Sequence, residues 1–593
     1  MAYKYILGIS AFFHDSSAVL LKNSEIIAAV QEERFTRIKF DNRFPKQSIK
    51  QCLEIGKIDI ENVDTIAFYE DPSIKWDRIF YNFLHYEKFN FKNFKKLKNF
   101  LDKKFYVEAI IKQIYLKNFK GKIIFVNHHL SHASSSFYPS PFEKACVVTI
   151  DAIGEWSSTS IGIGDKNKII NLKEQKYPHS LGFLYSAFTE YLGFKVDCDE
   201  YKVMGLAPYG KPKYIEKIKK NLIYINEDGS FELNTHYFNF IKKNNMINKN
   251  FENLFGFSKK DKKESLETHH YDLAASIQKV LEEIFIKIVK YAIQITKENK
   301  VTLAGGVALN CVANGRLLNE KIVKDLWVQP AAGDAGGALG AALFVYYHHL
   351  NNKRENRIND TQKDSLLGPE FSNDEIKLTL ERLHFKYRFV DNFDDICDFA
   401  VDEIKNGKVI GFFQNRMEFG PRALGSRSII ADPRNKNMQK ILNLKIKFRE
   451  SFRPFAPIVL TKYVNEWFEN VDKSPYMLVT TKVKKEKLRA LNNDEKEKQG
   501  LELLSVVRSE IPAITHVDNS ARIQTVDEES SKRIYLLLKK FYEKTGCPIL
   551  INTSFNIMNE PIVCTPADAL NCYTKTNLDI LIIGNYILNK NEN

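Results

Sequence analysis

Two histidines, His128 and His132, are spaced to share one metal ion. If residues 128–138 begin a helix, as the pattern predicts, both imidazoles lie one turn apart on one face. Asp151 ends an apolar, β-branched run that is typical of a buried strand, so its carboxylate would emerge at the strand's edge. Two nitrogens and one oxygen form a set that suits iron, manganese or zinc better than calcium.

The alternative is that these histidines cap a helix or complete hydrogen bonds inside a core. Two glycine-rich turns further along the chain indicate phosphate or nucleotide binding, and one of them supplies a further candidate ligand. A strand ends at Gly305-Gly306 ahead of Asn310, where backbone can approach a ligand closely and a helix N-terminus offers amides to an anion or nucleotide. Residues 329–342 form the second turn, and Asp334 at its mouth is the natural fourth ligand. One such turn alone more often reflects tight packing.

The predicted strands and loops that position these residues occur twice in the same order along the chain. The order strand, polar loop, strand, hairpin, strand is predicted over residues 4–31 and again over residues 146–172. This pattern predicts two similar lobes across a cleft, the plan of the actin, sugar-kinase and chaperone ATPase superfamily. Helices are expected over 76–119 and 270–298, whereas the glycines and proline of 177–210 favour an ordered loop region.

A second α/β domain is predicted after a polar stretch without periodicity. The expected division is residues 1–352, a linker at 353–373 and a domain at 374–593. In that domain Lys445, Lys447, Arg449 and Arg453 alternate along the chain, and on a strand they would aim several cations at one point, which suits phosphate or pyrophosphate. A solvated strand face would show the same alternation. The residues that could complete such a site are Arg422, Arg427, Arg522, Asn552 and Ser554.

Composition indicates an ordinary globular protein. The 593 residues are 44% hydrophobic and 27% charged, and the formal charge of +14 comes mainly from scattered lysines rather than from a concentrated basic stripe. Nucleic-acid binding is therefore the less favoured interpretation. Eight dispersed cysteines without a CxxC pair, and the absence of a signal peptide or an apolar run of roughly 18–20 residues, predict a cytoplasmic protein with reduced thiols and no membrane partner.

Taken together, these motifs resemble the NodU/CmcH-type O-carbamoyltransferases nearly end to end. The segments that carry the resemblance are residues 8–15, 31–37, 128–132, 151–156, 305–310, 333–337, 419–427, 452–457 and 552–556. The resemblance implies an α/β fold with duplicated actin-like ATPase-type lobes, similar to the tRNA threonylcarbamoyl transferase fold, followed by a YrdC-like C-terminal domain. It also implies that carbamoyl phosphate and ATP give carbamoyl-adenylate and pyrophosphate, and that the carbamoyl group then moves to a hydroxyl of a small-molecule or glycan acceptor.

The resemblance assigns residue roles as well. His14 would be the acceptor's base. The other implied sets are a divalent metal held by His128, His132, Asp151 and Asp334; an adenylate pocket of Gly305, Gly306 and Asn310; and carbamoyl phosphate and ATP bound by Arg422, Arg427, Lys445, Arg449, Arg453, Arg522, Asn552 and Ser554. Iron is the expected metal, with manganese or zinc as alternatives, and Mg²⁺ accompanies ATP.

Two other functions stay open at this point. One is a tRNA-modifying carbamoylation enzyme, which strong salt-dependent tRNA binding would support. The other is a non-catalytic nucleotide-dependent switch, which needs neither the paired histidines nor an arginine-rich second domain. The acceptor's identity and the oligomeric state are also open, with a homodimer as one option.

Overall fold

The computed structural model describes residues 4–86, 107–240, 245–355 and 357–593. The chain forms two compact units, and each is described by itself. The first unit contains residues 1–32, 40–313 and 321–361, and the second contains residues 33–39, 314–320 and 362–593. The main change of unit, after residue 361, falls within residues 353–373. The two short segments that belong to the second unit had no signal in the sequence.

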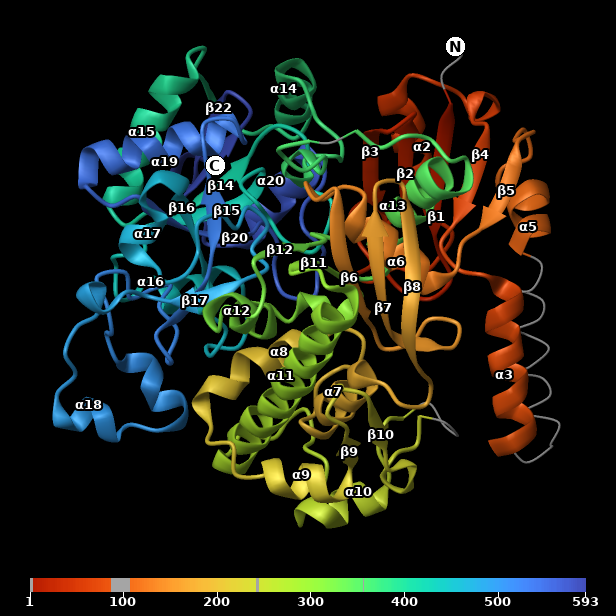
Figure 1. Cartoon of the computed structure of the whole chain (residues 1–593). Helices are drawn as coiled ribbons and strands as arrows, with labels where there is room; N and C mark the ends of the chain where they lie inside the picture. The colour runs from red at the N-terminus through yellow and green to blue at the C-terminus, as the bar shows by residue number, and fades with distance from the viewer. Residues whose placement is uncertain (1–3, 87–106, 241–244, 356) are drawn as a thin grey trace. The chain divides into compact units, whose positions relative to one another are not determined.

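The first unit is built on two five-stranded sheets of the same design (Figure 1). Their strand orders are β3-β2-β1-β4-β5 and β8-β7-β6-β11-β12. In each sheet the first strand pairs antiparallel with a hairpin on one side and parallel with a later strand on the other. The strands are β1 Tyr5–Ser10, β2 Ser17–Lys22, β3 Glu25–Gln31, β4 Thr65–Phe68, β5 Lys122–Phe125, β6 Lys144–Ile150, β7 Ser157–Asp165, β8 Lys168–Lys176, β11 Lys300–Ala304 and β12 Asp325–Val328. The predicted α/β class and duplicated lobes are confirmed.

Two short helices pack against each other and against these sheets. Helix α6, His128–Phe137, follows β5 and packs on β6, β7 and β11, whereas α13, Asp334–Leu343, follows β12 and packs on β1, β2 and β4. Gly340 of α13 lies so close to α6 that a β-carbon there would overlap the Ser131 carbonyl. The small residues of α13 therefore serve helix packing, and the predicted helix at 128–138 is confirmed.

The remaining helices of the first unit surround this centre. They include α2 Lys46–Gly56, α3 Pro72–Tyr86, α7 Leu181–Tyr191, α8 Glu200–Leu206, α9 Ile215–Asn221, α10 Lys249–Phe255 and α11 Thr268–Thr296, whereas most of α12, Cys311–Asn319, belongs to the second unit. Helix α11 confirms the predicted helix at 270–298. Within the segment predicted as helical over 76–119, residues 87–106 lie outside the described part. No helix of the described residues is long and apolar enough to cross a bilayer.

The expectation of loops over 177–210 was wrong. Helix α7 begins after Ser180, whose Oγ accepts a hydrogen bond from the Phe183 amide at 3.1 Å. Gly182 in its first turn costs about 1 kcal/mol of helix propensity. Burial of nearly every α7 side chain outweighs that cost, because tertiary packing supplies most helix stability in proteins.

The second unit is organised on an eight-stranded mixed sheet in the order β13-β22-β21-β14-β15-β20-β16-β19. Its strands are β13 Arg388–Phe389, β14 Ile410–Phe413, β15 Arg427–Ala431, β16 Ala456–Leu460, β19 Gln524–Val526, β20 Ile549–Ser554, β21 Ile580–Ile583 and β22 Tyr586–Asn589. Among its helices are α14 Asn373–Arg382, α15 Phe393–Lys405, α19 Lys532–Thr545 and α20 Pro566–Lys575. Apolar faces of α15 and α19 complete the core of this unit.

The predicted strand pattern of cations at residues 445–453 was also wrong. Leu442–Ile446 is a helical turn, and the next strand, β16, begins only at Ala456. Leu442 and Ile446 are buried at helical spacing, which sets the conformation of the segment. As a result Lys445 is exposed and Lys447 is buried, so the two lysines do not point the same way.

Candidate metal centre and the loops of the second unit

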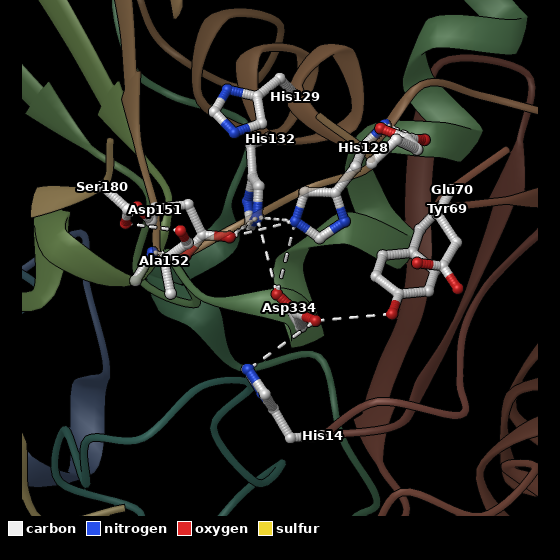
Figure 2. A network of polar contacts seen from close by, with 12 residues as sticks. His14, Tyr69, Glu70, His128, His129, His132, Asp151, Ala152, Ser180 and Asp334 are labelled. Carbon is white, nitrogen blue, oxygen red and sulfur yellow. Dashed lines mark hydrogen bonds and ion pairs between the residues drawn. The ribbon is translucent and has the colours of Figure 1, made fainter. Parts of the chain in front are cut away.

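His128, His132, Asp151 and Asp334 come together in the first unit, as Figure 2 shows. Each offers one ligand atom, these atoms all lie within 4.8 Å of one another, and all four residues are buried. The two Nε2 atoms are 3.0 Å apart, and each lies 3.7 Å from Asp334 Oδ1. His128 Nε2 is also 3.1 Å from Asp151 Oδ2. Two imidazole nitrogens and two carboxylate oxygens form a donor set that suits zinc, manganese or iron.

The hydrogen bonding of this cluster is incomplete in a way that fits a cation. A neutral imidazole has one donor and one acceptor nitrogen, so at most one of the facing Nε2 atoms can donate to the other. Asp334 Oδ1 is buried and accepts no hydrogen bond from the described residues. A buried carboxylate oxygen without a donor costs about 1–3 kcal/mol or more. A divalent ion would satisfy all four atoms together.

The electrostatics of the cluster favour a protonated His132 and an ionised Asp151. Burial opposes protonation of His132, but the nearby Asp151 and Asp334 carboxylates outweigh it and raise the pKa of His132 to about 9. Burial likewise opposes ionisation of Asp151, yet its hydrogen bonds to His128 and His132 hold the pKa of that carboxyl well below its usual range. His129 differs, because burial lowers the pKa of His129 to about 3 and its Nδ1 lies 3.1 Å from Ser160 Oγ. It is therefore a neutral neighbour.

Glu155 anchors the start of α6 and was not singled out from the sequence. Its carboxylate accepts hydrogen bonds from the amides of His128 at 2.9 Å and Asp71 at 2.8 Å, and from Asn127 Nδ2 at 3.1 Å. Asn127 caps the same helix by accepting from the Leu130 amide. An acidic residue soon after the strand that ends at Asp151 was the available signal. Its effect is to fix the helix that carries both histidines.

His14 lies at the edge of this cluster. Its Nε2 is 3.9 Å from Asp334 Oδ2 and its Nδ1 is 3.1 Å from Asp15 Oδ2, and 24% of its side chain is exposed. Burial opposes protonation, but the Asp334 and Asp15 carboxylates outweigh it and raise the pKa of His14 to about 10. Tyr69 donates to Asp334 Oδ2 from the other side at 3.5 Å (Figure 2). His14 is thus the group of this network that a solvent-borne molecule can reach.

The residues expected in an adenylate pocket have identifiable contacts. Gly305 has φ +89°, and a β-carbon there would overlap the Ile150 carbonyl. The Gly306 amide donates to Asp151 Oδ1 at 2.9 Å and so supports a proposed metal ligand. The Asn310 carboxamide pairs with Gln278 of α11 through contacts of 3.0 and 3.1 Å. The structure therefore fixes the orientation of Asn310 and does not by itself show a nucleotide contact.

In the second unit, a buried carboxylate shapes the loop at residues 418–427. Glu418 Oε1 accepts the amides of Leu424 and Ser426 at 2.8 Å and that of Arg427 at 3.1 Å. Arg34, from the short segment at 33–39, donates to the Gly420 carbonyl at 2.7 Å. These contacts give the motif at 31–37 a structural role in this loop. Neither Glu418 nor Arg34 was predicted as a site residue.

Arg427 does not face a ligand, contrary to the prediction. It is fully buried, and its Nη1 donates to the carbonyls of Gln414 at 2.6 Å and Asn415 at 3.0 Å, while Nη2 donates to Pro369 O at 3.2 Å. The guanidinium also lies 3.6 Å from the centre of the Phe413 ring. Burial lowers the pKa of Arg427 to about 10, still above neutral pH. The side chain holds backbone segments together inside the unit.

Replacing Arg427 with methionine is expected to lower the free energy of unfolding by about 3 kcal/mol. The change leaves several buried carbonyls without a donor, and each was bonded to a charged group. Thermal unfolding followed by circular dichroism and by activity measures the loss. Arg382→Met on α14 is the matched control, because Arg382 is exposed and its loss should change stability by less than about 0.5 kcal/mol. Equal stability of the two variants would contradict this role.

Some of the other predicted anion-binding residues do gather. Lys447, rather than exposed Lys445, reaches Ser554 Oγ at 3.2 Å and the Asn556 carbonyl at 2.8 Å. Burial, together with Arg449 and nearby cations, lowers the pKa of Lys447 well below its usual value. Arg449 bonds Asn443 Oδ1 at 2.7 Å and lies over the Phe455 ring, and Arg453 is 3.6 Å from Glu450.

The last three predicted residues lie on strands of the second unit or on the loop at 418–427. Asn552 of β20 bonds Gln524 at 2.7 Å and the Ala423 carbonyl at 3.2 Å, which ties the strand to the loop that carries Arg422. Arg522 ends the strand β18, Ser520–Arg522, and pairs with Thr480 in a separate two-stranded sheet.

Comparison with known families decides what kind of protein this is. Residues 5–343 match the family model Carbamoyltransferase N-terminus, and residues 401–590 match Carbamoyltransferase C-terminus. The chain belongs to the carbamoyltransferase family. The resemblance inferred from the motifs is therefore confirmed, and each of the two family matches falls mainly in one structural unit.

Relatives of this carbamoyltransferase extend over nearly its whole length. It is 47% identical to the protein sll1178 of Synechocystis sp. over 99% of this chain and 97% of that protein. It is 35% identical to the nodulation protein NolNO of Sinorhizobium fredii over 98% of this chain and 80% of that protein. Among solved structures, HypF of T. kodakarensis aligns with a TM-score of 0.31 and 12% identity, over 59% of this chain and 49% of that chain.

Proposed function

We propose that this carbamoyltransferase makes carbamoyl-adenylate from carbamoyl phosphate and ATP and transfers the carbamoyl group to a hydroxyl of a small-molecule or glycan acceptor. The observation that carries the proposal is the convergence of two imidazoles and two carboxylates beside a partly exposed histidine, in a member of this family. Iron is the proposed metal, with manganese or zinc as alternatives, and Mg²⁺ accompanies ATP.

The first step forms the activated donor. A carbamate oxygen bonds to the α-phosphorus of ATP, and pyrophosphate leaves. The phosphate of carbamoyl phosphate departs as inorganic phosphate, with one water consumed. The reactants are anions, so the step needs cations close together. Arg422, Arg449 and Arg453 of the second unit are the proposed donors, with Ser554 and Asn552 as neutral partners.

The second step transfers the carbamoyl group. The acceptor oxygen bonds to the carbamoyl carbon, the bond to the adenylate oxygen breaks, and AMP leaves. An alcohol is a poor nucleophile at neutral pH, so His14 takes its proton in this proposal. His128, His132, Asp151 and Asp334 would hold a divalent cation, which would stabilise the developing negative charge as a Lewis acid. Its charge would also offset the carboxylates that otherwise keep a proton on His14.

The proposal is tested by mixing the protein with ATP, labelled carbamoyl phosphate and a metabolite extract of the source cell. Pyrophosphate is expected only when both ATP and carbamoyl phosphate are present, and mass spectrometry should show a metabolite that gains one carbamoyl group. Omitting either substrate is the control. The absence of pyrophosphate with both substrates present would refute adenylate formation, and pyrophosphate without any carbamoylated product would refute transfer.

A further inference from the structure

Helix α3 in the first unit carries two buried polar atoms that accept or donate no hydrogen bond within the described part of the chain. Arg78 and Asn82 are four residues apart and so lie one turn apart on the same face. The two atoms are Arg78 Nε and Asn82 Oδ1. Burial lowers the pKa of Arg78, while the charges of Glu70 and Glu155 oppose that shift. Leaving such groups unsatisfied costs free energy, so the pair is suited to a ligand that bonds to both.

Aromatic side chains contact Arg78 and its neighbour on the same helix, Tyr81. The Arg78 guanidinium lies over the Tyr177 ring at 5.4 Å, and the Tyr81 ring meets Trp156 edge-on at 5.6 Å. Tyr177 in turn meets Phe183 and Phe240 edge-on, each at 6.3 Å. Ligand pockets commonly combine aromatic walls with a few fixed polar groups in this way.

The same residues adjoin the metal cluster through Glu155. Trp156 is the next residue in the chain, and the Glu155 carboxylate bonds both to the amide of Asp71, just before α3, and to the amide of His128 at the start of α6. Glu70, the other acid near Arg78, is paired with Lys75 in a buried ion pair. Neither acid forms an ion pair with Arg78 among the described contacts. The Glu155 carboxylate thus links the start of α3 to the metal cluster, and its charge acts on Arg78.

We propose that Arg78, Asn82 and the neighbouring aromatic residues bind the acceptor, and that this acceptor is a sugar bearing a carboxylate or a phosphate. This inference rests on the proposed carbamoyl transfer and adds the substrate class. A guanidinium donates two parallel hydrogen bonds to a carboxylate or phosphate, and stacking on Tyr177 leaves that edge available. Asn82 Oδ1 accepts from a ring hydroxyl, and the apolar face of a sugar ring packs on the aromatic wall.

Tryptophan fluorescence of the full chain tests the site, because Trp156 forms part of its wall. The protein is titrated with D-glucuronate, with glucose 6-phosphate and with glucose as the neutral matched sugar. At least one acidic sugar should quench saturably, with affinity at least tenfold above that of glucose, and which one does so separates carboxylate from phosphate recognition. Arg78→Met should remove that preference. Equal responses to all three sugars, or none, would overturn the proposal.

A second variant separates ligand binding from any structural role of Arg78. Asn82→Asp places a carboxylate one turn from the guanidinium, so the variant should unfold at the same temperature as the parent or higher. The new charge should nevertheless lower affinity for the acidic sugar at least tenfold. Asp77→Asn is the control, because Asp77 is exposed on the same helix and its loss should leave affinity unchanged. Parental affinity in Asn82→Asp would contradict the site.

The two proposals fail in distinguishable ways. Pyrophosphate release from ATP and carbamoyl phosphate does not require an acceptor, so it tests donor activation alone. If the protein releases pyrophosphate but binds acidic sugars no better than glucose, only the acceptor site is contradicted. If the protein releases no pyrophosphate but binds an acidic sugar preferentially, and Arg78→Met removes that preference, only the proposed donor chemistry is contradicted.

Discussion

Replacing Asp334 with asparagine is expected to strip the protein of its metal and to lower carbamoyl transfer by at least about a hundredfold. Asp334 Oδ1 lies 3.7 Å from the Nε2 atoms of both His128 and His132, so it completes the proposed four-residue ligand set. A neutral amide is a much weaker ligand than a carboxylate. Elemental analysis of the purified variant and a transfer assay measure the two effects.

The Asp334 variant should still release pyrophosphate from ATP and carbamoyl phosphate, because the cations proposed for that step belong to the second unit. Asp165→Asn is the matched control, since Asp165 is an exposed aspartate at the end of β7 in the same unit. It should keep the parental metal content. If Asp334→Asn bound as much metal as the control, the proposed metal site would be contradicted.

The His14→Asn variant is expected to lose transfer by about a hundred- to ten-thousandfold, the usual contribution of a general base. Its metal content should not change, because His14 lies 3.9 Å from Asp334 and outside the four-residue ligand set. Pyrophosphate release should also persist. The expected signature is therefore a protein that binds metal and activates the donor but does not pass the carbamoyl group on.

The control for His14 is His384→Asn, which alters an exposed histidine of the second unit. Its transfer rate should match that of the parent. If His14→Asn transferred at the parental rate, another group would have to accept the proton. If metal were lost together with transfer, His14 would be a ligand rather than a base.

The metal cluster was predictable because its signals are local. The spacing of His128 and His132 specifies one helix face, and Asp151 follows a strand whose apolar run is unambiguous. Asp334 was harder to predict, because it lies far along the chain, but the glycine-rich turn marked it as the start of a helix. Duplication of the strand order then suggested that these segments meet.

Predictions failed where long-range contacts decide the outcome. Nothing near Arg427 in the sequence says that its donors are used by the carbonyls of residues 369, 414 and 415. Glu418 was missed for the same reason, because its three bonds to backbone amides depend on how the following loop folds back. At Lys445 and Lys447 the alternation of charge suggested a strand, whereas burial of apolar neighbours imposes a helical turn.

The helices α6 and α13 are exchanged between the lobes, each leaving the last strand of one sheet to pack on the other sheet. Each lobe therefore buries part of its sheet under a helix that follows the last strand of the other lobe. During synthesis, residues up to Leu343 must be available before His128 and His132 can lie beside Asp334, so the four-residue cluster can form only after both lobes have been made. A metal ion bound there would hold the two lobes together.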